Sequence, residues 1–337
     1  MDAREERLNV LVMAPMLDRD LSWVSAVDER ITVLDGNDAF VAEQRGPRVA
    51  RGDELLAQAE VLLVGFPVPR DLASRAPRLR WAHHSQAGVS NLWESDLWTS
   101  DVMLTSSRGS VSPTAIAEYV VAAVFHFARG LHEGSRQKAD GAFTRDGYEM
   151  RAVAGSTLGI IGLGGIGREV ARIGRAVGMR VIATRRSVAT AREDVDVDRL
   201  LPPDQLLEVA AQSDFLAVCS QLTAETRDMI DAEVFAVMKP TAVLVNIARG
   251  EEVDELALVD ALQRGEIAGA VLDVHRDEFR RAPIPELLQL PQVLITPHIS
   301  GGGQVTPRTL EPIFVQNLRR FLDGLPMLNV VDRERGY

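Results

Sequence analysis

The sequence predicts an α/β fold: two Rossmann-like, doubly wound parallel-sheet domains with a cleft between them. Two observations support this class. Short apolar segments alternate with helical segments through both halves of the chain, and one alternation carries a glycine-rich turn between its strand and its helix. The 337 residues are enough for two domains, each with its own hydrophobic core.

The first hundred residues predict one parallel sheet with right-handed crossovers. Helical segments, such as residues 52–58, separate several of the apolar segments. After a linker rich in Ser, Gly and Pro, Pro113 marks the start of a long apolar helix that runs from Thr114 to about His132. Polar residues 134–155 then predict an arm or loop. The expected strands of this half are residues 10–14, 31–34, 61–65, 79–83 and 102–105.

The second half predicts another doubly wound sheet, and a last helix follows it over residues 307–322. Because this helix comes after the second sheet is complete, we expect it to return to the first domain. The first domain is then discontinuous, with residues 1–106 and 302–337 on either side of a second domain of residues 107–301. The expected strands of the second half are residues 158–161, 180–183, 215–219, 243–246, 269–272 and 293–296.

The most informative segment, residues 158–186, reads LGIIGLGGIGREVARIGRAVGMRVIATRR. Its order of strand, glycine turn, helix and strand is the context in which a G-x-G-x-x-G motif binds a dinucleotide. The first glycine permits a tight turn, the second lets a pyrophosphate approach the backbone, and the third lets helix and strand pack closely. The N–H groups at the start of the helix face the phosphates. The residues expected at the cofactor here are Gly162, Gly164, Gly165, Ile166 and Gly167.

The end of the next strand indicates which dinucleotide is bound. NAD enzymes usually carry Asp or Glu there, whereas this strand ends Thr184-Arg185-Arg186-Ser187 and no carboxylate follows until Glu193. The two guanidinium groups suit the 2′-phosphate of NADP, and the hydroxyls of Thr184 and Ser187 could add donors. We therefore predict NADP as the cofactor, with NAD as the alternative if Arg185 and Arg186 are an ordinary solvated pair.

Composition argues against several other classes. The net charge of −11 disfavours a nucleic-acid partner. The single cysteine, Cys219, rules out an intramolecular disulfide and lies in an apolar strand, and no Cys/His cluster has zinc spacing, so no metal is expected. The longest apolar stretch, residues 119–128, is too short to span a membrane, and the N-terminus does not resemble a signal peptide. We expect a soluble, cytoplasmic protein.

Three polar residues of the second half, Arg249, Glu278 and His298, each follow an apolar strand. They are expected at one edge of the sheet, where open α/β folds bind ligands. A guanidinium can hold the carboxylate of a 2-keto acid and polarise its ketone, and an imidazole can protonate the developing alkoxide. A carboxylate beside the imidazole orients it and favours its charged form. His275 is a second candidate imidazole, but it lies only three residues before Glu278, and we prefer His298.

These motifs together resemble the D-isomer-specific 2-hydroxyacid dehydrogenase family, and its glyoxylate/hydroxypyruvate reductases in particular. The matching segments are LGIIGLGGIGREVA, VLVNIARGEEVDE, VLDVHRDE and VLITPHISGG, with LRWAHHSQAGVSNL and NVVDRERGY nearer the two ends. The resemblance implies an NAD(P)-dependent 2-keto acid reductase that forms D-2-hydroxy acids with Arg249, Glu278 and His298 as catalytic trio. It also implies a substrate-binding first domain, a dinucleotide-binding second domain and a homodimer formed through the latter.

The resemblance assigns further residues to the site. Backbone N–H groups of the turn Ala87-Gly88-Val89 bind the substrate carboxylate, beside Arg249 and His298. Asp273 ends a strand and is expected either to bind the nicotinamide carboxamide or to cap the strand. The remaining expected cofactor neighbours are Thr114, Cys219, Ala248 and Gly301.

The chain departs from the family pattern at four positions. Ser90 stands where Asp is usual, Ser220 and Phe279 where Pro is frequent, and His275 where Phe is common. None of these changes removes a proposed catalytic group, but they leave loop geometry and substrate preference open.

The predicted function is hydride transfer between NADP(H) and a small 2-keto acid or D-2-hydroxy acid, with His298 as proton donor and acceptor. One alternative is a phosphoglycerate dehydrogenase-like enzyme. Another is a non-catalytic, nucleotide-sensing protein like the corepressors that share this architecture and keep a similar trio. Turnover of a keto acid distinguishes an enzyme from such a sensor.

Overall fold

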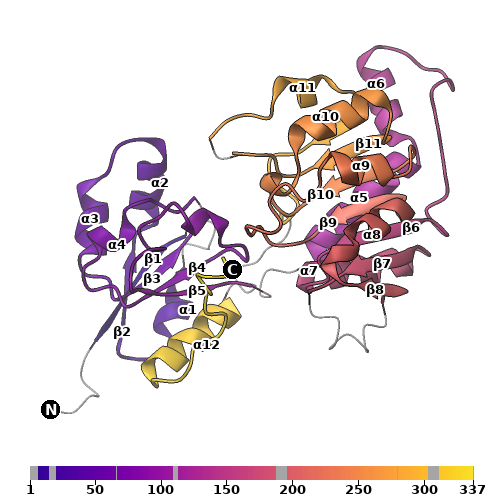
Figure 1. Ribbon diagram of the computed structural model, residues 1–337. Coiled ribbons are helices and arrows are strands. Elements are labelled where there is room, and N and C mark those ends of the chain that lie inside the picture. The colour runs from indigo at the N-terminus through magenta and orange to yellow at the C-terminus, as the bar shows by residue number, and fades with distance from the viewer. Residues whose placement is uncertain are drawn as a thin grey trace. The chain divides into compact units, whose positions relative to one another are not determined.

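The computed structural model describes residues 7–14, 20–65, 67–108, 113–186, 196–278, 280–302 and 311–336 (Figure 1). The chain forms two compact units, the first of Met1–Ser112 with Gln304–Tyr337 and the second of Pro113–Gly303. Each unit is built on its own parallel sheet with helices on both faces. The predicted class of two doubly wound α/β domains is confirmed.

The first unit contains a five-stranded parallel sheet in the order β2-β1-β3-β4-β5, which is the flavodoxin-like order. Side chains that alternate along the strands enter two hydrophobic clusters, one on each face. The strands are β1 (Leu8–Met13), β2 (Ile31–Asp35), β3 (Val61–Val64), β4 (Trp81–His84) and β5 (Met103–Ser106).

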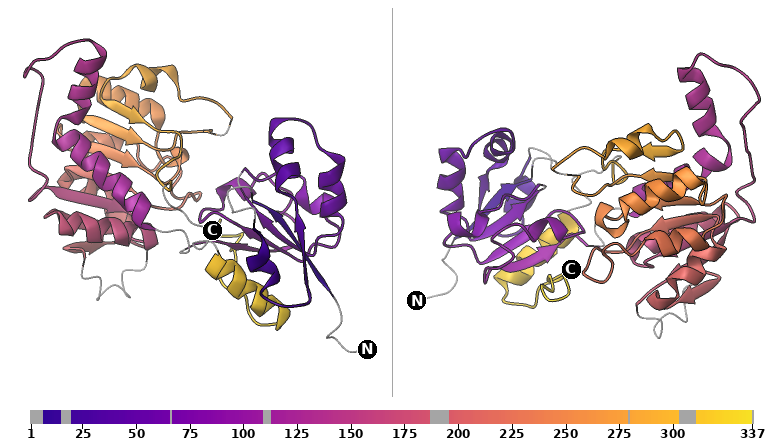
Figure 2. Two further views of the ribbon diagram at one scale, coloured as in Figure 1. Left: turned by 180° about the vertical axis from the view of Figure 1, so that it is seen from behind. Right: turned by 45° about the horizontal axis from the view of Figure 1, so that its top comes forward.

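Two groups of helices cover the faces of this sheet. Helices α2 (Asn37–Arg45), α3 (Ala50–Leu56) and α4 (Leu72–Arg75) pack on one face, and α1 (Ser22–Ser25) and α12 (Glu311–Leu322) pack on the other. Figure 2 shows α12, in yellow, beside the first sheet. Phe314 of α12 stacks on Trp81 of β4 with ring centroids 5.3 Å apart. The C-terminal helix therefore belongs to the core of the first unit, although it follows the last strand of the second sheet.

The second unit contains a seven-stranded parallel sheet in the order β12-β11-β10-β9-β6-β7-β8. The order reverses between β6 and β9, which makes the carboxyl ends of these two strands the switch point of the sheet. Every predicted strand overlaps an observed one, and β8 is additional. The strands are β6 (Thr157–Ile161), β7 (Arg180–Thr184), β8 (Arg199–Leu201), β9 (Phe215–Val218), β10 (Val243–Asn246), β11 (Gly269–Leu272) and β12 (Val293–Ile295).

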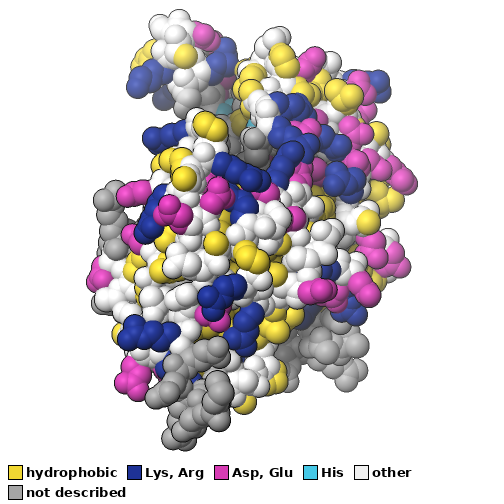
Figure 3. Space-filling view, turned by 90° about the vertical axis from the view of Figure 1, so that its left-hand side faces the viewer, with side chains coloured by type: hydrophobic (Ala, Val, Ile, Leu, Met, Phe, Trp, Pro, Cys, Tyr) yellow, Lys and Arg dark blue, Asp and Glu magenta, His cyan; other side chains and the backbone are white. Residues whose placement is uncertain are grey.

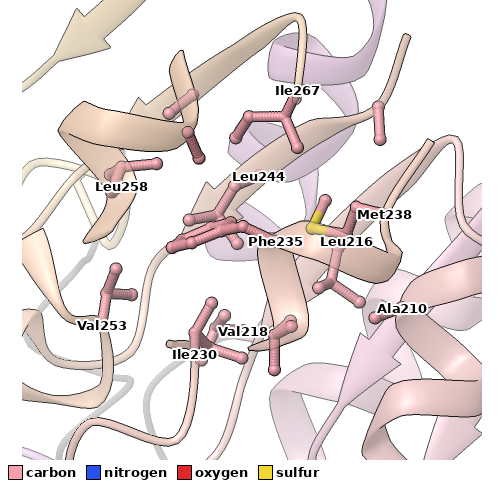
Figure 4. Close-up of a cluster of buried hydrophobic side chains, with 14 of the residues drawn as sticks. Ala210, Leu216, Val218, Ile230, Phe235, Met238, Leu244, Val253, Leu258 and Ile267 are labelled. Carbon is pink, nitrogen blue, oxygen red and sulfur yellow. The ribbon is translucent and has the colours of Figure 1, made fainter. Parts of the chain in front are cut away.

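Helices α5 (Pro113–Ala128) and α7 (Gly165–Ala176) cover one face of the second sheet. The opposite face packs on a cluster that includes Phe235, Leu216 and Leu244 (Figure 4). The helices on that face are α8 (Leu206–Gln212), α9 (Ala232–Val237), α10 (Glu255–Arg264) and α11 (Pro285–Gln289). Short 3-10 turns lie at η1 (Ser90–Leu92), η2 (Pro203–Gln205) and η3 (Gly250–Glu252).

The predicted helix from Thr114 to His132 is wrong at its C-terminal end. Helix α5 stops at Ala128, and α6 (Leu131–Ala139) continues at an angle of 70° to it. Gly130, with φ of 67°, makes the break, and the Tyr148 ring occupies the space that a side chain would need there. Helix α6 also takes up the start of the predicted polar arm. No single helix among the described residues is long and apolar enough to cross a membrane; only α5 and α6 taken together meet that test.

Figure 3 shows one face of the molecule, on which basic and acidic side chains lie beside each other. Ion pairs of the first unit have the same character, for example Arg70 with Glu94 and Arg30 with Asp28, each at 2.8 Å. An exposed pair such as Arg70 with Glu94 adds little stability because water screens it.

Candidate active site

The glycine turn between β6 and α7 lies at the switch point of the second sheet. Gly162 has φ of 98°, and a Cβ there would lie 2.8 Å from the backbone of Ser220, the second residue after β9. A Cβ at Gly167 would lie 2.3 Å from the carbonyl oxygen of Gly162. Side chains are thus excluded at both positions, as tight turning and close helix–strand packing require.

The start of α7 has room for a phosphate group. A Cβ added at Gly164 or Gly165 would find no described atom within 4 Å. The open space faces the N-terminus of a helix of 12 residues, where backbone N–H groups and the helix dipole favour an anion. Ile166 packs partly into the core beneath this turn. The residues present therefore fit a dinucleotide pyrophosphate.

Thr184, at the end of β7, supports the glycine turn from below. Its hydroxyl oxygen accepts a hydrogen bond from the Gly162 N–H at 3.3 Å, and its carbonyl accepts one from the Leu163 N–H at 2.9 Å. Thr184 is buried, whereas Arg185 is partly exposed and Arg186 is exposed. The structure therefore gives Thr184 a structural role in the turn. Ser187 lies outside the described residues.

The Arg249 turn follows β10 and is held by a buried amide. Asn246 Oδ1 accepts a hydrogen bond from the Ala248 N–H at 3.0 Å, and its Nδ2 donates to the Arg249 carbonyl at 2.9 Å. The Arg249 guanidinium donates from Nη1 to the Ala248 carbonyl at 2.6 Å. Asn246 thus shapes the backbone from which Arg249 projects. The sequence interpretation passed over it, although a polar residue that ends a buried strand is a usable signal.

His298 and Glu278 are in direct contact. His298 Nδ1 lies 3.0 Å from Glu278 Oε1, and the side chains are 37% and 9% exposed. A carboxylate can only accept, so Nδ1 is the donor in this contact. The predicted pairing of imidazole and carboxylate is therefore present.

The loop that carries His298 is organised around Asp273. This buried carboxylate accepts hydrogen bonds from the Ile299 and Ser300 N–H groups, both at 2.8 Å, and from the Thr296 hydroxyl at 2.6 Å. The His298 N–H donates to the Asp273 carbonyl at 2.9 Å. His298 itself has φ of 53°, a left-handed conformation that costs a non-glycine residue energy. The contacts of Asp273 hold the loop in that conformation.

The three residues predicted as the catalytic trio share one edge of the second sheet. Arg249, Glu278 and His298 follow β10, β11 and β12, which are consecutive neighbours in the sheet. The direct contact is between Glu278 and His298, and Arg249 lies at the end of the adjacent strand. His275 instead turns back on its own loop, with Nδ1 3.1 Å from the Arg276 carbonyl.

The other predicted cofactor residues also lie in the second unit. Thr114 is the second residue of α5, and its hydroxyl donates to Glu169 of α7 at 3.0 Å. Ala248 is buried in the Arg249 turn, and Gly301 follows the His298 loop. Cys219 follows β9; burial, aided by the charge of the Glu252 carboxyl, raises the pKa of its thiol to about 12, so it is not a nucleophile near neutral pH.

The predicted carboxylate-binding turn, Ala87-Gly88-Val89, lies in the first unit after β4. Val89 is buried in the core of that unit. The Ser107 N–H donates to the carbonyls of His84 and Gln86, both at 3.1 Å, and so fixes the chain that leads into the turn.

Comparison with known proteins identifies the family. Residues 121–300 match the family described as D-isomer specific 2-hydroxyacid dehydrogenase, NAD binding domain. A glyoxylate reductase of Korarchaeum cryptofilum is 33% identical over 286 residues, which cover 82% of this chain and 83% of that enzyme. A D-3-phosphoglycerate dehydrogenase of Methanocaldococcus jannaschii is 30% identical over 282 residues, which cover 83% of this chain but 53% of that enzyme.

A solved structure points the same way. The D-isomer specific 2-hydroxyacid dehydrogenase from Xanthobacter autotrophicus, crystallised with NADPH and MES, has a TM-score of 0.78 and 28% identity and covers 98% of this chain and 100% of that chain. The family match spans more than half of the sequence. The chain therefore belongs to the D-isomer-specific 2-hydroxyacid dehydrogenases and is an NAD(P)-dependent enzyme of that family.

Proposed function

We propose that this enzyme reduces small 2-keto acids to D-2-hydroxy acids with NADPH, and that glyoxylate and hydroxypyruvate are the first substrates to test. The observation that carries the proposal is the His298–Glu278 contact at 3.0 Å beside the Arg249 turn, at the edge of the sheet that also holds the glycine turn. Several similar proteins are named glyoxylate reductase, among them the Korarchaeum cryptofilum enzyme.

The residues divide the chemistry among them. A bound nicotinamide dinucleotide supplies the hydride. Arg249 binds the substrate carboxylate and polarises the ketone, which makes the carbonyl carbon a better hydride acceptor. His298 gives the proton on Nε2 to the oxygen as its negative charge develops, so one hydride and one proton convert the ketone to an alcohol. Glu278 accepts from Nδ1 and keeps the ring in the orientation that this transfer needs.

Arg185 and Arg186 support NADP as the cofactor. They follow β7, whose neighbour β6 leads into the glycine turn, and this is where an NAD enzyme carries an acidic residue. The Xanthobacter autotrophicus neighbour was crystallised with NADPH. A guanidinium at this strand end recognises the extra phosphate of NADPH by charge-assisted hydrogen bonds.

The main experiment follows the loss of NADPH absorbance with a panel of keto acids: glyoxylate, hydroxypyruvate, pyruvate and phosphohydroxypyruvate. We expect turnover with the small acids, and preference for the phosphorylated one would instead indicate the phosphoglycerate dehydrogenase alternative. Tight NADPH binding without turnover across the panel would reject the enzyme proposal in favour of a nucleotide sensor.

The cofactor proposal has its own matched pair of variants. Arg185→Asp should lower kcat/KM for NADPH by about 10- to 100-fold relative to NADH, because one charge-assisted contact is lost and a repulsion is added. Arg180→Asp makes the same charge change at the opposite end of β7 and should leave the ratio unaltered. An unchanged NADPH/NADH ratio in Arg185→Asp would overturn the phosphate clamp.

We also include the homodimer and the cytoplasmic location in the proposal. Phe143 and Met150, which follow α6, and Leu131 within it are exposed apolar side chains of the second unit. Exposed apolar groups of this size favour a protein partner, and a second copy is the expected one. Light scattering on the purified protein should give about twice the mass of one chain; a monomeric mass at micromolar concentration would reject the dimer.

A further inference from the structure

Glu252 is a buried carboxyl group that the proposed chemistry does not use. It ends the 3-10 turn η3, three residues after Arg249, and its side chain is 0% exposed. The Glu252 N–H donates to the Arg249 carbonyl at 3.2 Å, so both residues belong to one turn. A fully buried acid is rare unless it is paired or neutral.

The surroundings of Glu252 leave the carboxyl incompletely satisfied. The Ser220 hydroxyl donates a hydrogen bond to Oε2, and Oε1 has no hydrogen-bond partner among the described residues. Ile230, whose N–H donates to the Glu252 carbonyl at 3.0 Å, and Val253 both lie in the hydrophobic cluster of Figure 4. The side chain thus sits between an apolar core and the Arg249 turn.

The charged and titratable groups near Glu252 come from several elements. Arg249 and Glu251 belong to its own turn, and Cys219 approaches it from the end of β9. Burial raises the pKa of Glu252 to about 7, against the hydrogen bond from Ser220 and the attraction of Arg249, which lower it, and with the repulsion of Glu251, which adds to it.

Two further segments pack on this turn. The backbone at His275 and Arg276 lies against Gly250, where an added Cβ would be 1.9 Å from the His275 carbonyl carbon. The Asp228 N–H donates to the Glu251 carbonyl at 2.9 Å. The Asp228 carboxylate forms an ion pair with Arg276, which balances these two charges against each other. Arg249 is therefore the cation that attracts Glu252.

We propose that Glu252 is a positioning residue that controls how much of the Arg249 charge is available to the substrate carboxylate. When Glu252 is ionised, it competes with the substrate for the guanidinium. When it is protonated, Arg249 is available to the keto acid. The inference rests on the proposed function, because it takes Arg249 to be the substrate anchor.

Two consequences follow by linkage. Binding of the keto acid anion beside Glu252 favours its protonated form, so substrate binding takes up a proton from solution. KM for glyoxylate therefore rises with pH through the neutral range, whereas kcat is little affected by Glu252. An effective dielectric constant of about 20 gives two charges within one turn a coupling equivalent to about tenfold or more in affinity.

The test compares KM and kcat for glyoxylate with NADPH, from acid to alkaline pH, in the wild type, Glu252→Gln and Glu225→Gln. Glu252→Gln keeps the shape of a neutral carboxyl, and Glu225→Gln removes one exposed carboxylate of the same unit. The rest of the site is common to all three proteins, so the difference between them isolates Glu252. We expect the rise in KM to be about tenfold smaller in Glu252→Gln and unchanged in Glu225→Gln.

Ser220→Ala gives an independent check that does not depend on the fold of the Gln variant. The Ser220 hydrogen bond favours the charged carboxylate, so its loss should move the rise in KM to higher pH. Calorimetry with oxamate, an unreactive keto acid analogue, in two buffers of different ionisation enthalpy measures the proton uptake directly. Uptake should be lower in Glu252→Gln than in the wild type.

The outcomes are distinguishable. The same KM profile and the same proton uptake in wild type and Glu252→Gln, with turnover intact, overturn the role of Glu252 and leave the proposed function standing. An absence of both turnover and oxamate binding in the wild type overturns the proposed function, and the role of Glu252 falls with it.

Discussion

His83 of the first sheet and His298 of the second both lie near the carboxyl end of a parallel strand, but their surroundings are opposite. His83 is 0% exposed, and its two ring nitrogens lie 2.7 Å from the Thr105 hydroxyl and 3.0 Å from the Ser107 hydroxyl. His298 is 37% exposed at its side chain, and one nitrogen contacts Glu278. Both nitrogens of the first ring are hydrogen-bonded inside the protein, whereas the second ring is partly exposed and faces a carboxylate.

The network around His83 also fixes its chemical form. The Trp81 indole can only donate, and it donates to the Thr105 hydroxyl at 2.8 Å. Thr105 can then donate to His83 Nδ1, which makes Nε2 the donor to Ser107. Burial, with a smaller effect from His84, lowers the pKa of His83 to about 3, so the ring is neutral at ordinary pH.

The comparison shows that a position at a strand end does not by itself make a catalytic residue. Burial with hydrogen-bonding hydroxyls converts the first histidine into a structural element of its sheet. Exposure, a carboxylate partner and an unfavourable backbone conformation favour the proposed functional role of the second. Four predictions follow from this contrast, in order of decreasing effect.

Replacing His298 should abolish most activity without affecting stability. His298→Gln removes the proton donor, and we expect kcat to fall by about 100- to 10,000-fold, with the Kd of NADPH within about twofold. His275→Gln is the matched control, because it removes the other histidine of this edge, and it should keep most of the activity. Steady-state kinetics and NADPH fluorescence measure both quantities; comparable losses in the two variants would contradict the assignment.

Replacing His83 should do the reverse. His83→Ala leaves a cavity and removes one hydrogen-bond partner from each of two buried hydroxyls, and we expect a loss of about 3–5 kcal/mol in the free energy of unfolding of the first unit. All four tryptophans, at positions 23, 81, 93 and 98, lie in the first unit, so urea unfolding followed by intrinsic fluorescence reports on that unit alone. Ser107→Ala, which removes one end of the network, should cost about 1 kcal/mol. If His83→Ala loses less unfolding free energy than Ser107→Ala, the hydrogen-bond network around His83 does not stabilise the first unit.

The pH dependence of stability should differ between the units. An unfolded histidine gains a proton below pH 6.5 and the folded His83 does so only near pH 3, so the first unit loses stability as pH falls through this window. The folded Glu252 keeps its proton up to about pH 7, whereas the unfolded Glu252 keeps it only up to about pH 4.5. The second unit therefore gains stability as pH falls through this window.

The size of each effect can be isolated with a non-titrating substitute. Between about pH 8 and pH 5, His83 should cost the first unit about 2 kcal/mol and Glu252 should contribute about 3 kcal/mol to the second. Fluorescence follows the first unit, and far-UV circular dichroism follows both. The slope should flatten in His83→Gln for the fluorescence transition and in Glu252→Gln for the part of the dichroism transition that fluorescence does not report. Parallel slopes in variant and wild type would refute the assigned protonation states.

Much of this architecture could be predicted because buried parallel strands are continuous apolar runs. The strand β8 (Arg199–Leu201) was missed because it is three residues long and begins with a charged residue at the sheet edge. The break at Gly130 was missed because the apolar pattern of α5 continues into the next turn. At both positions a short local feature determines the structure, although the apolar pattern over a longer stretch of sequence indicates otherwise.

The site was only partly predictable for a different reason. Glycine spacing pointed to the turn between β6 and α7, and strand-end residues pointed to the contact between His298 and Glu278, because these signals are local in sequence. Asn246 and Glu252 were not singled out, because their roles depend on backbone contacts or on burial. Glu252 in particular lies in a charged run, EEVDE, that a sequence pattern indicates as solvated. Ser187 and Phe279 lie outside the described residues.

The smallest expected effect separates the two predicted roles of Asp273. If Asp273 mainly holds the His298 loop, Asp273→Asn should lower kcat by about tenfold. The carboxylate of Asp273 accepts hydrogen bonds from two backbone N–H groups, and the NH2 of an amide would face one of them as a second donor. The Kd of NADPH should then stay within about twofold. If Asp273 instead binds the nicotinamide carboxamide, the Kd of NADPH should rise by about tenfold or more in the same variant. Thr296→Val is the matched control, since it removes one donor to Asp273 Oδ1 and leaves the carboxylate in place. Thr296→Val should lower kcat less than Asp273→Asn does and should leave NADPH binding unchanged. If Asp273→Asn loses only cofactor affinity, Asp273 binds the nicotinamide carboxamide and does not mainly hold the loop.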